Sequence, residues 1–218
     1  MNIDPDDIQG SIAGKYANLQ RYALFCAACA GKNSHQQSAK LDMFEEFLQR
    51  TFGKHHRIFD LINMADDVQL LQALKYSALG KYNLLLLGFK AIALDPEWPG
   101  KKGDRLDKVA KYSGYGIKTA SLFNMHAFHE WCACLDTYIL RWLAGDAMFH
   151  DAPIEIKPPS YKNVPRQSIS NWDIYERWED AFLSQCGQRG LSPLELDKQI
   201  WLHSRIKTEK PKTQELPL

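Results

Sequence analysis

The stretch "YSGYGIKTASLF", Tyr112 to Phe123, is the most informative in the chain. Gly114 and Gly116 flank a tyrosine, and glycine permits backbone conformations that strain other residues, so the stretch predicts a tight turn. An apolar helix follows at once, with Lys118 in its first turn. A helix N-terminus presents N–H groups that lack intrahelical partners, together with partial positive charge, and both suit a phosphate. The position of Lys118 therefore needs a chemical reason, because a lysine adds positive charge where the helix already supplies it.

Helical signals continue on both sides of this turn, and strand signals are rare. Asp4-Pro5 predicts the start of a helix, and apolar residues then recur every three or four positions from Ile8 to Cys26. Prolines and glycines predict a loop at 95–103 and an irregular crossing segment at 151–168. The sequence therefore predicts an all-α fold of roughly nine or ten helices, with a polar, disordered tail from residue 207.

Length and composition narrow the class of protein. The chain has 218 residues and is 45% hydrophobic, which is enough to bury one large core or two small ones. Lys and Arg total 27 against 26 Asp and Glu, so any basic surface for nucleic acid must be local. The acidic N-terminus lacks the pattern of a secretory signal, and no apolar segment reaches the roughly 18 residues of a membrane span. We expect a soluble cytoplasmic protein, nucleoid-associated if the source is prokaryotic.

The cysteines allow two interpretations. An odd number in an apolar context suits reduced thiols, whereas two closely spaced pairs could together form a four-sulfur zinc site. Both pairs lie in runs rich in alanine and leucine, where cysteine behaves as a small buried hydrophobe, so we favour thiols and expect no metal. The five cysteines are Cys26, Cys29, Cys132, Cys134 and Cys186.

A basic stretch precedes the glycine turn. Its members are Lys101, Lys102, Arg105, Lys108 and Lys111. Together with the N-terminus of the next helix, these cations could hold a nucleic-acid backbone without reading its sequence. The alternative is a plain pair of helices with a solvated charged face.

A second feature stands eighteen residues after Lys118. Asp136 follows an apolar run and opens an apolar helix, "DTYILRWL", so it is typical of a helix N-cap. Taken alone, Asp136 indicates nothing more than a cap.

Together these features match a family pattern. Residues 114–120, followed by Leu135-Asp136-Thr137 and Arg141, resemble the helix-hairpin-helix DNA glycosylase superfamily, which includes endonuclease III and the 8-oxoguanine glycosylases. The close match covers roughly residues 104–143, about a fifth of the chain. The resemblance implies a helix-hairpin-helix motif at about 104–128 and a catalytic pair, Lys118 and Asp136. The implied contacts to the DNA backbone are Gly114, Gly116, Lys118 and Thr119.

The resemblance also implies a reaction. The damaged nucleotide leaves the duplex, Lys118 attacks C1′ as a free amine, and the imine that forms allows β-elimination of the 3′ phosphate. Desolvation and the positive end of the helix both disfavour an ammonium, which gives the lysine a reason to stand there. Asp136 would stabilise positive charge at the anomeric carbon or assist proton transfer. The implied activity is a bifunctional N-glycosylase and AP lyase, acting on double-stranded DNA as a monomer, with no membrane partner.

Departures from the family pattern leave the choice of base open. Ser113 stands where relatives often have proline, Tyr115 where they have a small aliphatic residue, and Tyr138 where histidine is common. Only Cys186 follows Asp136, so we predict no iron–sulfur cluster and no other cofactor, with room only for a monovalent cation at the hairpin. The absence of a cluster favours the 8-oxoguanine branch. The alternatives are another oxidised or modified base, or a non-catalytic helix-hairpin-helix DNA-binding protein.

Three residues are candidates for the base pocket. "LSPLELDKQIW" resembles the C-terminal helix of some archaeal and bacterial 8-oxoguanine glycosylases, which implies that Trp201 stacks on the flipped base; the alternative is a core tryptophan. Asn33 or Gln36 could fill the gap left by that base, and the alternative for both is a cap or loop role. The resemblance finally implies two helical subdomains flanking a cleft that holds the site. One is a helical barrel at 21–114; the other combines 1–20 with 115–206, followed by a flexible tail at 207–218.

Overall fold

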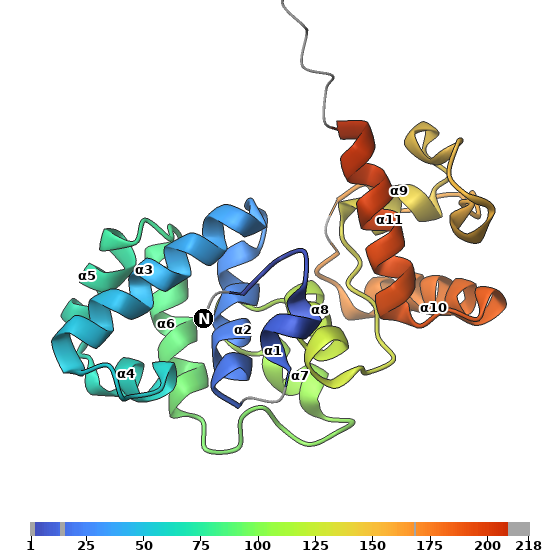
Figure 1. Cartoon of the computed structure of the whole chain (residues 1–218). Coiled ribbons are helices and arrows are strands. Elements are labelled where there is room, and N and C mark those ends of the chain that lie inside the picture. Colours follow the sequence, from blue (N-terminus) through green and yellow to red (C-terminus); the bar gives the residue numbers. More distant parts are fainter. Residues whose placement is uncertain (1–2, 14–15, 168, 209–218) are drawn as a thin grey trace, which may run out of the picture. The chain divides into compact units, whose positions relative to one another are not determined.

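The computed structural model describes residues 3–13, 16–167 and 169–208, and every regular element in these ranges is helical (Figure 1). The all-α prediction is confirmed. The elements are α1 (Ile8–Ile12), α2 (Tyr16–Cys29), α3 (Ser34–Phe52), α4 (Ile58–Met64), α5 (Asp67–Tyr76), α6 (Tyr82–Leu94), α7 (Arg105–Ala110), α8 (Ile117–Phe128), α9 (Thr137–Leu143), η1 (Ala147–Phe149), η2 (Ile154–Ile156), α10 (Trp172–Arg189) and α11 (Pro193–Thr208). None of the helices in these ranges is long and apolar enough to cross a bilayer. The disordered tail was predicted to start at residue 207, but α11 continues to Thr208, and 209–218 lie outside the described residues.

The chain divides into two compact units, unit 1 (Met1–Glu130) with α1 to α8 and unit 2 (Trp131–Leu218) with α9 to α11. This division follows chain order and differs from the expected grouping of 1–20 with 115–206. Helix α8 packs on α7, α2 and α1, so it belongs with the N-terminal helices of unit 1. The two subdomains and the cleft implied by the resemblance remain a prediction.

The first predicted helix is wrong in its start and its continuity. Asp4 does not cap it; α1 begins at Ile8, and the Asp7 side chain accepts a hydrogen bond from the Gly10 N–H at 3.1 Å. The helix stops at Ala13, whose ψ of 123° is extended, and α2 begins at Tyr16. The apolar repeat continues through this break because α1 and α2 pack against each other and bury the same face.

Helix α2 forms the centre of unit 1. It is buried over its whole second half, in contact with α1, α3, α4, α6 and α8. A helix covered on nearly all sides is apolar all round, and this accounts for the alanine- and cysteine-rich sequence of α2. Tyr22 stacks on Phe123 of α8, with ring centroids 5.9 Å apart, while Phe44 and Phe89 form an edge-to-face pair at 5.6 Å. The Tyr22–Phe123 contact holds α8, and with it the glycine turn, against α2.

Unit 2 encloses a smaller core. Helix α11 packs on α9 and α10, and the large buried side chains include Trp142 and Phe182. The segment between η1 and α10, predicted from its prolines to be irregular, has η2 as its one regular element among the described residues. Arg189 of α10 holds that segment, because its guanidinium donates to the carbonyls of Glu155 at 3.0 Å and Lys157 at 2.7 Å. The same guanidinium lies over the Trp142 ring, 5.1 Å from the centroid.

Candidate active site

The glycine turn joins α7 to α8 in unit 1. The Tyr115 N–H donates to the Tyr112 carbonyl at 3.0 Å and closes the turn. Gly114 has a φ of +84°, a left-handed conformation that other residues adopt only with strain, so glycine is required there by the backbone. Gly116 has an extended φ of −114° and forms the N-cap of α8.

The turn rests on α6. The Ser113 hydroxyl donates to the Leu84 carbonyl at 3.3 Å, and a Cβ on Gly88 would overlap with the Ser113 carbonyl oxygen. Gly88 therefore permits the turn to approach the α6 backbone. Ser113, which departs from the family pattern, contributes to this contact between the turn and α6 through its side chain.

Tyr115 also has a structural role. It is buried, and its hydroxyl donates to the Ala23 carbonyl of α2 at 2.5 Å. Burial raises the pKa of Tyr115 well above its usual value, so the phenol stays protonated as a donor. The Tyr115 side chain therefore fixes the turn against α2.

The N-terminus of α8 is open. No side chain caps it, and no acidic residue stands in its first turn. A Cβ on Gly116 would meet no atom within 4 Å, so the N-cap position of α8 borders open space. Thr119 is buried, whereas Lys118 is half-buried. The predicted backbone-binding residues 114, 116, 118 and 119 thus lie together on one helix end.

Lys118 lies near the C-terminal end of α2. Burial raises the pKa of the Cys29 thiol to about 12, and the charges of Lys118 and Lys81 oppose part of that rise. Both ammonium groups are therefore within electrostatic reach of one sulfur atom. Within unit 1, no described carboxylate forms an ion pair with Lys118.

Asp136 belongs to unit 2, where it is the N-cap of α9. One carboxylate oxygen accepts hydrogen bonds from the N–H groups of Tyr138 at 2.8 Å and Ile139 at 2.9 Å. The predicted cap is confirmed, and the carboxylate is half-buried. The catalytic role of Asp136 stays a prediction.

The segment that leads into Asp136 is clamped to α10, a feature that the sequence did not reveal. The Tyr175 hydroxyl donates to the Ala133 carbonyl at 2.5 Å and accepts from the Leu135 N–H at 3.2 Å. Glu179 accepts from the Ala133 N–H at 2.7 Å. Burial raises the pKa of Glu179, and the hydrogen bond from Ala133 offsets part of that rise.

Arg141 forms a local ion pair. Its guanidinium binds both carboxylate oxygens of Asp146, at 2.9 and 3.0 Å, and this interaction lowers the pKa of Asp146. Asp146 in turn caps η1 by accepting from the Met148 N–H at 3.0 Å. This residue of the family pattern therefore braces the end of α9.

The base-pocket candidates lie in separate units. Asn33 is the N-cap of α3 and accepts from the Gln36 N–H at 3.0 Å, and both side chains are exposed. Trp201 of α11 is only half-buried, so it is not a core residue, and the Arg205 guanidinium lies 4.7 Å from its ring centroid. Nothing in the structure tests a contact of these residues with a base.

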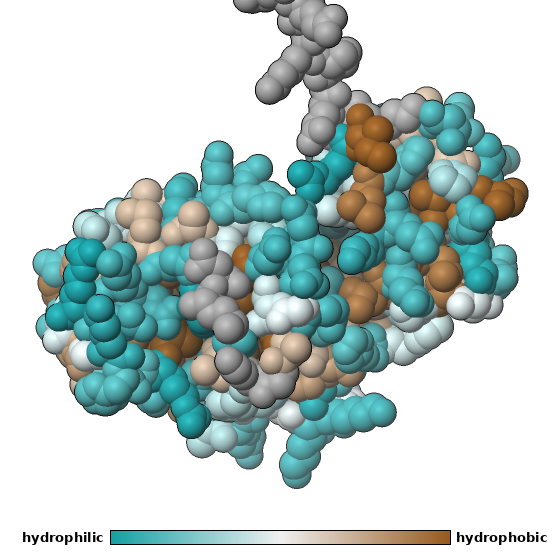
Figure 2. Space-filling view, in the orientation of Figure 1, coloured by the Kyte–Doolittle hydropathy of each residue, from teal (hydrophilic) through white to brown (hydrophobic). Residues whose placement is uncertain are grey.

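The surface of α11 beside Trp201 is apolar. Figure 2 shows apolar atoms over the C-terminal part of α11, where Leu202 and Ile206 are exposed. The opposite side of the helix carries Leu196, Ile200 and Ser204, which are buried in unit 2.

The basic stretch is less available than its sequence suggested. Arg105 forms an ion pair with Glu130 at 2.5 Å and lies over the Phe128 ring, and Lys108 pairs with Asp95 at 3.1 Å. These two cations therefore stabilise the fold. The other members, Lys101, Lys102 and Lys111, are exposed.

All five cysteines lie among the described residues, and none of them forms a disulfide: Cys26, Cys29, Cys132, Cys134 and Cys186. The described residues include no group of three or more His, Cys, Asp or Glu side chains that could hold a metal ion. The absence of an iron–sulfur cluster and other cofactors stays a prediction.

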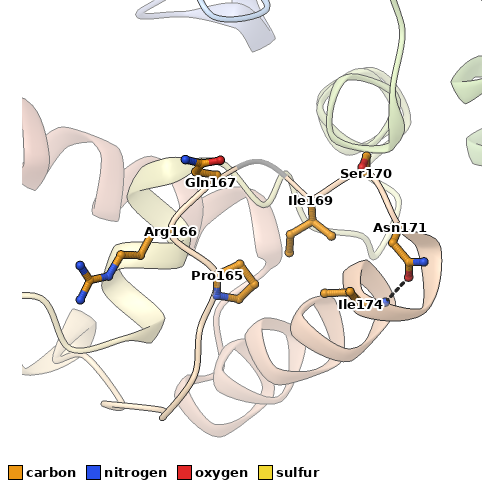
Figure 3. A pocket seen from close by; sticks show the side chains of 7 residues that line it. All are labelled: Pro165, Arg166, Gln167, Ile169, Ser170, Asn171 and Ile174. Carbon is orange, nitrogen blue, oxygen red and sulfur yellow. Dashed lines mark hydrogen bonds between the residues drawn. The ribbon is translucent and has the colours of Figure 1, made fainter.

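An open cavity of about 440 Å³ lies on unit 2 (Figure 3). Its walls come from the segment before α10 and the first turn of that helix. The Asn171 side chain, at the start of α10, accepts from the Ile174 N–H at 3.0 Å. The cavity includes none of the predicted site residues, so it gives no support to the predicted chemistry. The lining residues are Pro165, Arg166, Gln167, Ile169, Ser170, Asn171 and Ile174.

Comparison with known proteins supports the fold. No family model and no curated protein matches the chain. A solved structure that does is the crystal structure of the 8-oxoguanine glycosylase/lyase of Methanocaldococcus jannaschii in complex with a 15-mer DNA containing 8-oxoguanine. The match covers 93% of this chain and 87% of that one, with a TM-score of 0.57 and 15% sequence identity. The chain therefore shares the all-helical fold of that solved structure.

Proposed function

We propose that the protein is a DNA glycosylase with AP lyase activity that removes a damaged base from double-stranded DNA. The proposed substrate is 8-oxoguanine. One observation carries the proposal: Lys118 stands in the first turn of α8, whose uncapped N-terminus faces open space. The shared fold adds support, because the similar structure is that of a glycosylase/lyase bound to 8-oxoguanine DNA.

The end of α8 has the properties of a phosphate site. Neither backbone conformation nor packing inside the protein requires glycine at position 116, where φ is −114° and a Cβ would meet nothing. A missing side chain at an exposed helix N-terminus lets a phosphate approach the N–H groups closely. We infer that the DNA backbone adjoins Gly116 and thereby brings a sugar to Lys118.

The proposed reaction at Lys118 proceeds in two stages. After the nucleotide has left the stack, Nζ forms a bond to C1′ and the N-glycosidic bond breaks, so that the base leaves with its electron pair and gains a proton. Nζ then gives up one proton, the C1′–O4′ bond breaks with O4′ taking up a proton, and a protonated Schiff base forms between Nζ and C1′. Removal of a C2′ proton then breaks the C3′–O bond, the phosphate leaves, and water hydrolyses the imine.

Asp136 would assist this reaction from the N-terminus of α9. The cap bonds to Tyr138 and Ile139 hold its carboxylate in one orientation. A fixed carboxylate next to the sugar stabilises positive charge at C1′ or takes a proton from the lysine.

Borohydride trapping on a panel of lesion duplexes tests the function. The reductant fixes the Schiff base, so we expect a covalent adduct with duplexes that contain 8-oxoguanine. The adduct should disappear in Lys118→Gln and persist in Lys111→Gln, a matched change of an exposed lysine on the same hairpin. An adduct with a different lesion would assign the same chemistry to another base. DNA binding with no adduct on any lesion would overturn the enzymatic proposal and favour a non-catalytic DNA-binding protein.

A further inference from the structure

Two lysines in unit 1 join two loops reciprocally. Lys32, after α2, donates from Nζ to the Leu79 carbonyl at 2.5 Å. Lys81, before α6, donates from Nζ to the Ala30 carbonyl at 2.5 Å. Each loop thus supplies one ammonium and one acceptor to the other. We name this pair, Lys32 and Lys81, the lysine clasp.

The backbone around the lysine clasp is built to seat these ammonium groups. Gly80 has a φ of +71°, and a Cβ there would collide with the Nζ atom of Lys32. Lys81 itself has a φ of +49°, which is uncommon for a residue with a side chain. A strained backbone persists where surrounding structure fixes it, so the two ammonium positions are well defined.

The lysine clasp belongs to a group of four cations. The members are Lys32, Lys40, Lys81 and Lys118. Cys29 is within electrostatic reach of both Lys81 and Lys118. Burial, followed by the charges of Lys81 and Lys40, lowers the pKa of Lys32. No described carboxylate of unit 1 forms an ion pair with any member of the group.

Some other cations of unit 1 have a carboxylate partner. Arg21, Arg50, Lys90, Arg105 and Lys108 each pair with a carboxylate. Like charges gathered without a counter-charge repel one another and lower stability, and an anionic ligand removes that repulsion. The group around the lysine clasp therefore has the electrostatics of a site for a polyanion.

We propose that the lysine clasp binds a phosphodiester group of the DNA strand, in addition to the phosphate at the N-terminus of α8. An ammonium has three donors, and the carbonyl bond uses one of them, so donors remain on both lysines for phosphate oxygens. The carbonyl bonds also fix both side chains before DNA arrives, which reduces the entropy lost on binding. This inference rests on the proposed function, because it takes DNA as the ligand.

Salt-dependent DNA binding tests the lysine clasp. The probe is a duplex with a tetrahydrofuran abasic analogue, and the variants are Lys32→Gln, Lys81→Gln and the double variant. Glutamine keeps an N–H donor for the carbonyl but loses the charge. The matched control is Lys54→Gln, an exposed lysine at the other end of α3, about 28 Å along that 19-residue helix. Thermal unfolding of each variant shows that the fold is kept.

We expect about tenfold weaker binding at low salt in the double variant, and a slope of log Kd against log salt smaller by about one unit. Lys32→Arg with Lys81→Arg, which keeps both charges, should keep the slope. Wild-type values of affinity and slope in the double variant, alongside normal borohydride trapping, would overturn the lysine clasp as a phosphate site and leave the proposed function intact. Loss of both binding and trapping in the wild type would instead overturn the proposed function, and this inference with it.

Discussion

The Tyr115 hydroxyl donates a 2.5 Å hydrogen bond to the Ala23 carbonyl, and this contact fixes the glycine turn against α2, the central helix of unit 1. The turn therefore has a fixed position before any ligand binds. A fixed position matters for the proposed chemistry, because a nucleophile must be held close to its target atom.

Tyr115→Phe should destabilise the protein without changing its chemistry. The variant loses a buried hydrogen bond and leaves the Ala23 carbonyl without that donor, at a cost of about 1–3 kcal/mol in the free energy of unfolding. Urea unfolding measures the loss. Tyr16→Phe is the control, because Tyr16 is half exposed and should change stability little. If Tyr115→Phe were as stable as the wild type, the hydrogen bond from Tyr115 to Ala23 would not stabilise the fold.

Gly88→Ala should displace the turn. The new methyl group would overlap with a backbone atom, the Ser113 carbonyl oxygen, which cannot rotate away, so we expect a loss of about 1–3 kcal/mol. The same substitution at Gly187, in the interior of α10 with open space around it, should raise stability by up to about 1 kcal/mol. Thermal unfolding of the two variants compares identical chemistry in two environments. The prediction fails if Gly88→Ala is as stable as Gly187→Ala.

Gly116→Ala should weaken DNA binding while lowering stability by no more than about 1 kcal/mol, because alanine is a poorer N-cap residue than glycine. A Cβ there meets no protein atom, but it would hold a phosphate away from the helix N–H groups. Loss of a hydrogen bond to a charged group costs about 1.5–3 kcal/mol, so Kd should rise at least tenfold. Fluorescence anisotropy with duplex DNA is the measurement.

Gly114→Ala provides the opposite control, because its φ of +84° strains alanine by about 1–2 kcal/mol. It should lose stability first and DNA affinity only as a consequence. Unchanged DNA affinity in Gly116→Ala would remove the α8 N-terminus as a phosphate site.

Glu179→Gln should change how stability depends on pH. Burial raises the pKa of Glu179 above its ordinary value of 4.5, so between these two values the folded protein holds a proton that the unfolded chain has released. The free energy of unfolding therefore falls as pH rises through that interval. Glutamine accepts a hydrogen bond from the Ala133 N–H without carrying a charge. The free energy of unfolding of the variant should therefore rise relative to that of the wild type over this pH interval, and the difference should be constant at higher pH.

Urea unfolding of both proteins from pH 4 to 8 measures this difference. Glu155→Gln, an exposed glutamate of the same unit, serves as the control and should give a difference that does not vary with pH. If the difference in the free energy of unfolding between Glu179→Gln and the wild type did not vary with pH, burial would not raise the pKa of Glu179.

Local signals explain what the sequence could predict. Glycine at positions 114 and 116 and the apolar repeat of α8 are short-range features, and the structure has the turn and the helix where they indicated. The break between α1 and α2 was missed because both helices bury a face with the same repeat. The boundaries of the elements depend on caps, and Asp7, rather than Asp4, satisfies the first N–H groups.

Contacts between distant residues explain what the sequence could not predict. The clamp on Ala133 comes from Tyr175 and Glu179, over forty positions further on, and hydrogen bonds of this kind leave no periodic pattern. Lys32 reaches Leu79 across 47 positions for the same reason. The basic stretch was overestimated because a single sequence does not reveal that Glu130 pairs with a cation twenty-five positions before it.

Asp136→Asn should separate the cap from the chemistry. Asparagine caps helices about as well as aspartate, and its amide oxygen can still accept from Tyr138 and Ile139, so stability should stay within about 0.5 kcal/mol of the wild type. The charge that would stabilise C1′ or move a proton is lost, so base excision in single turnover should slow by about 10²- to 10⁴-fold while DNA affinity is kept.

Asp66→Asn is the matched control for this change. Asp66 caps α5 in the same way, by accepting from the Gln69 N–H at 2.8 Å, and it lies outside the proposed site. Its excision rate should equal that of the wild type. Full activity in Asp136→Asn would reduce Asp136 to a structural cap and leave Lys118 to act without a carboxylate from α9.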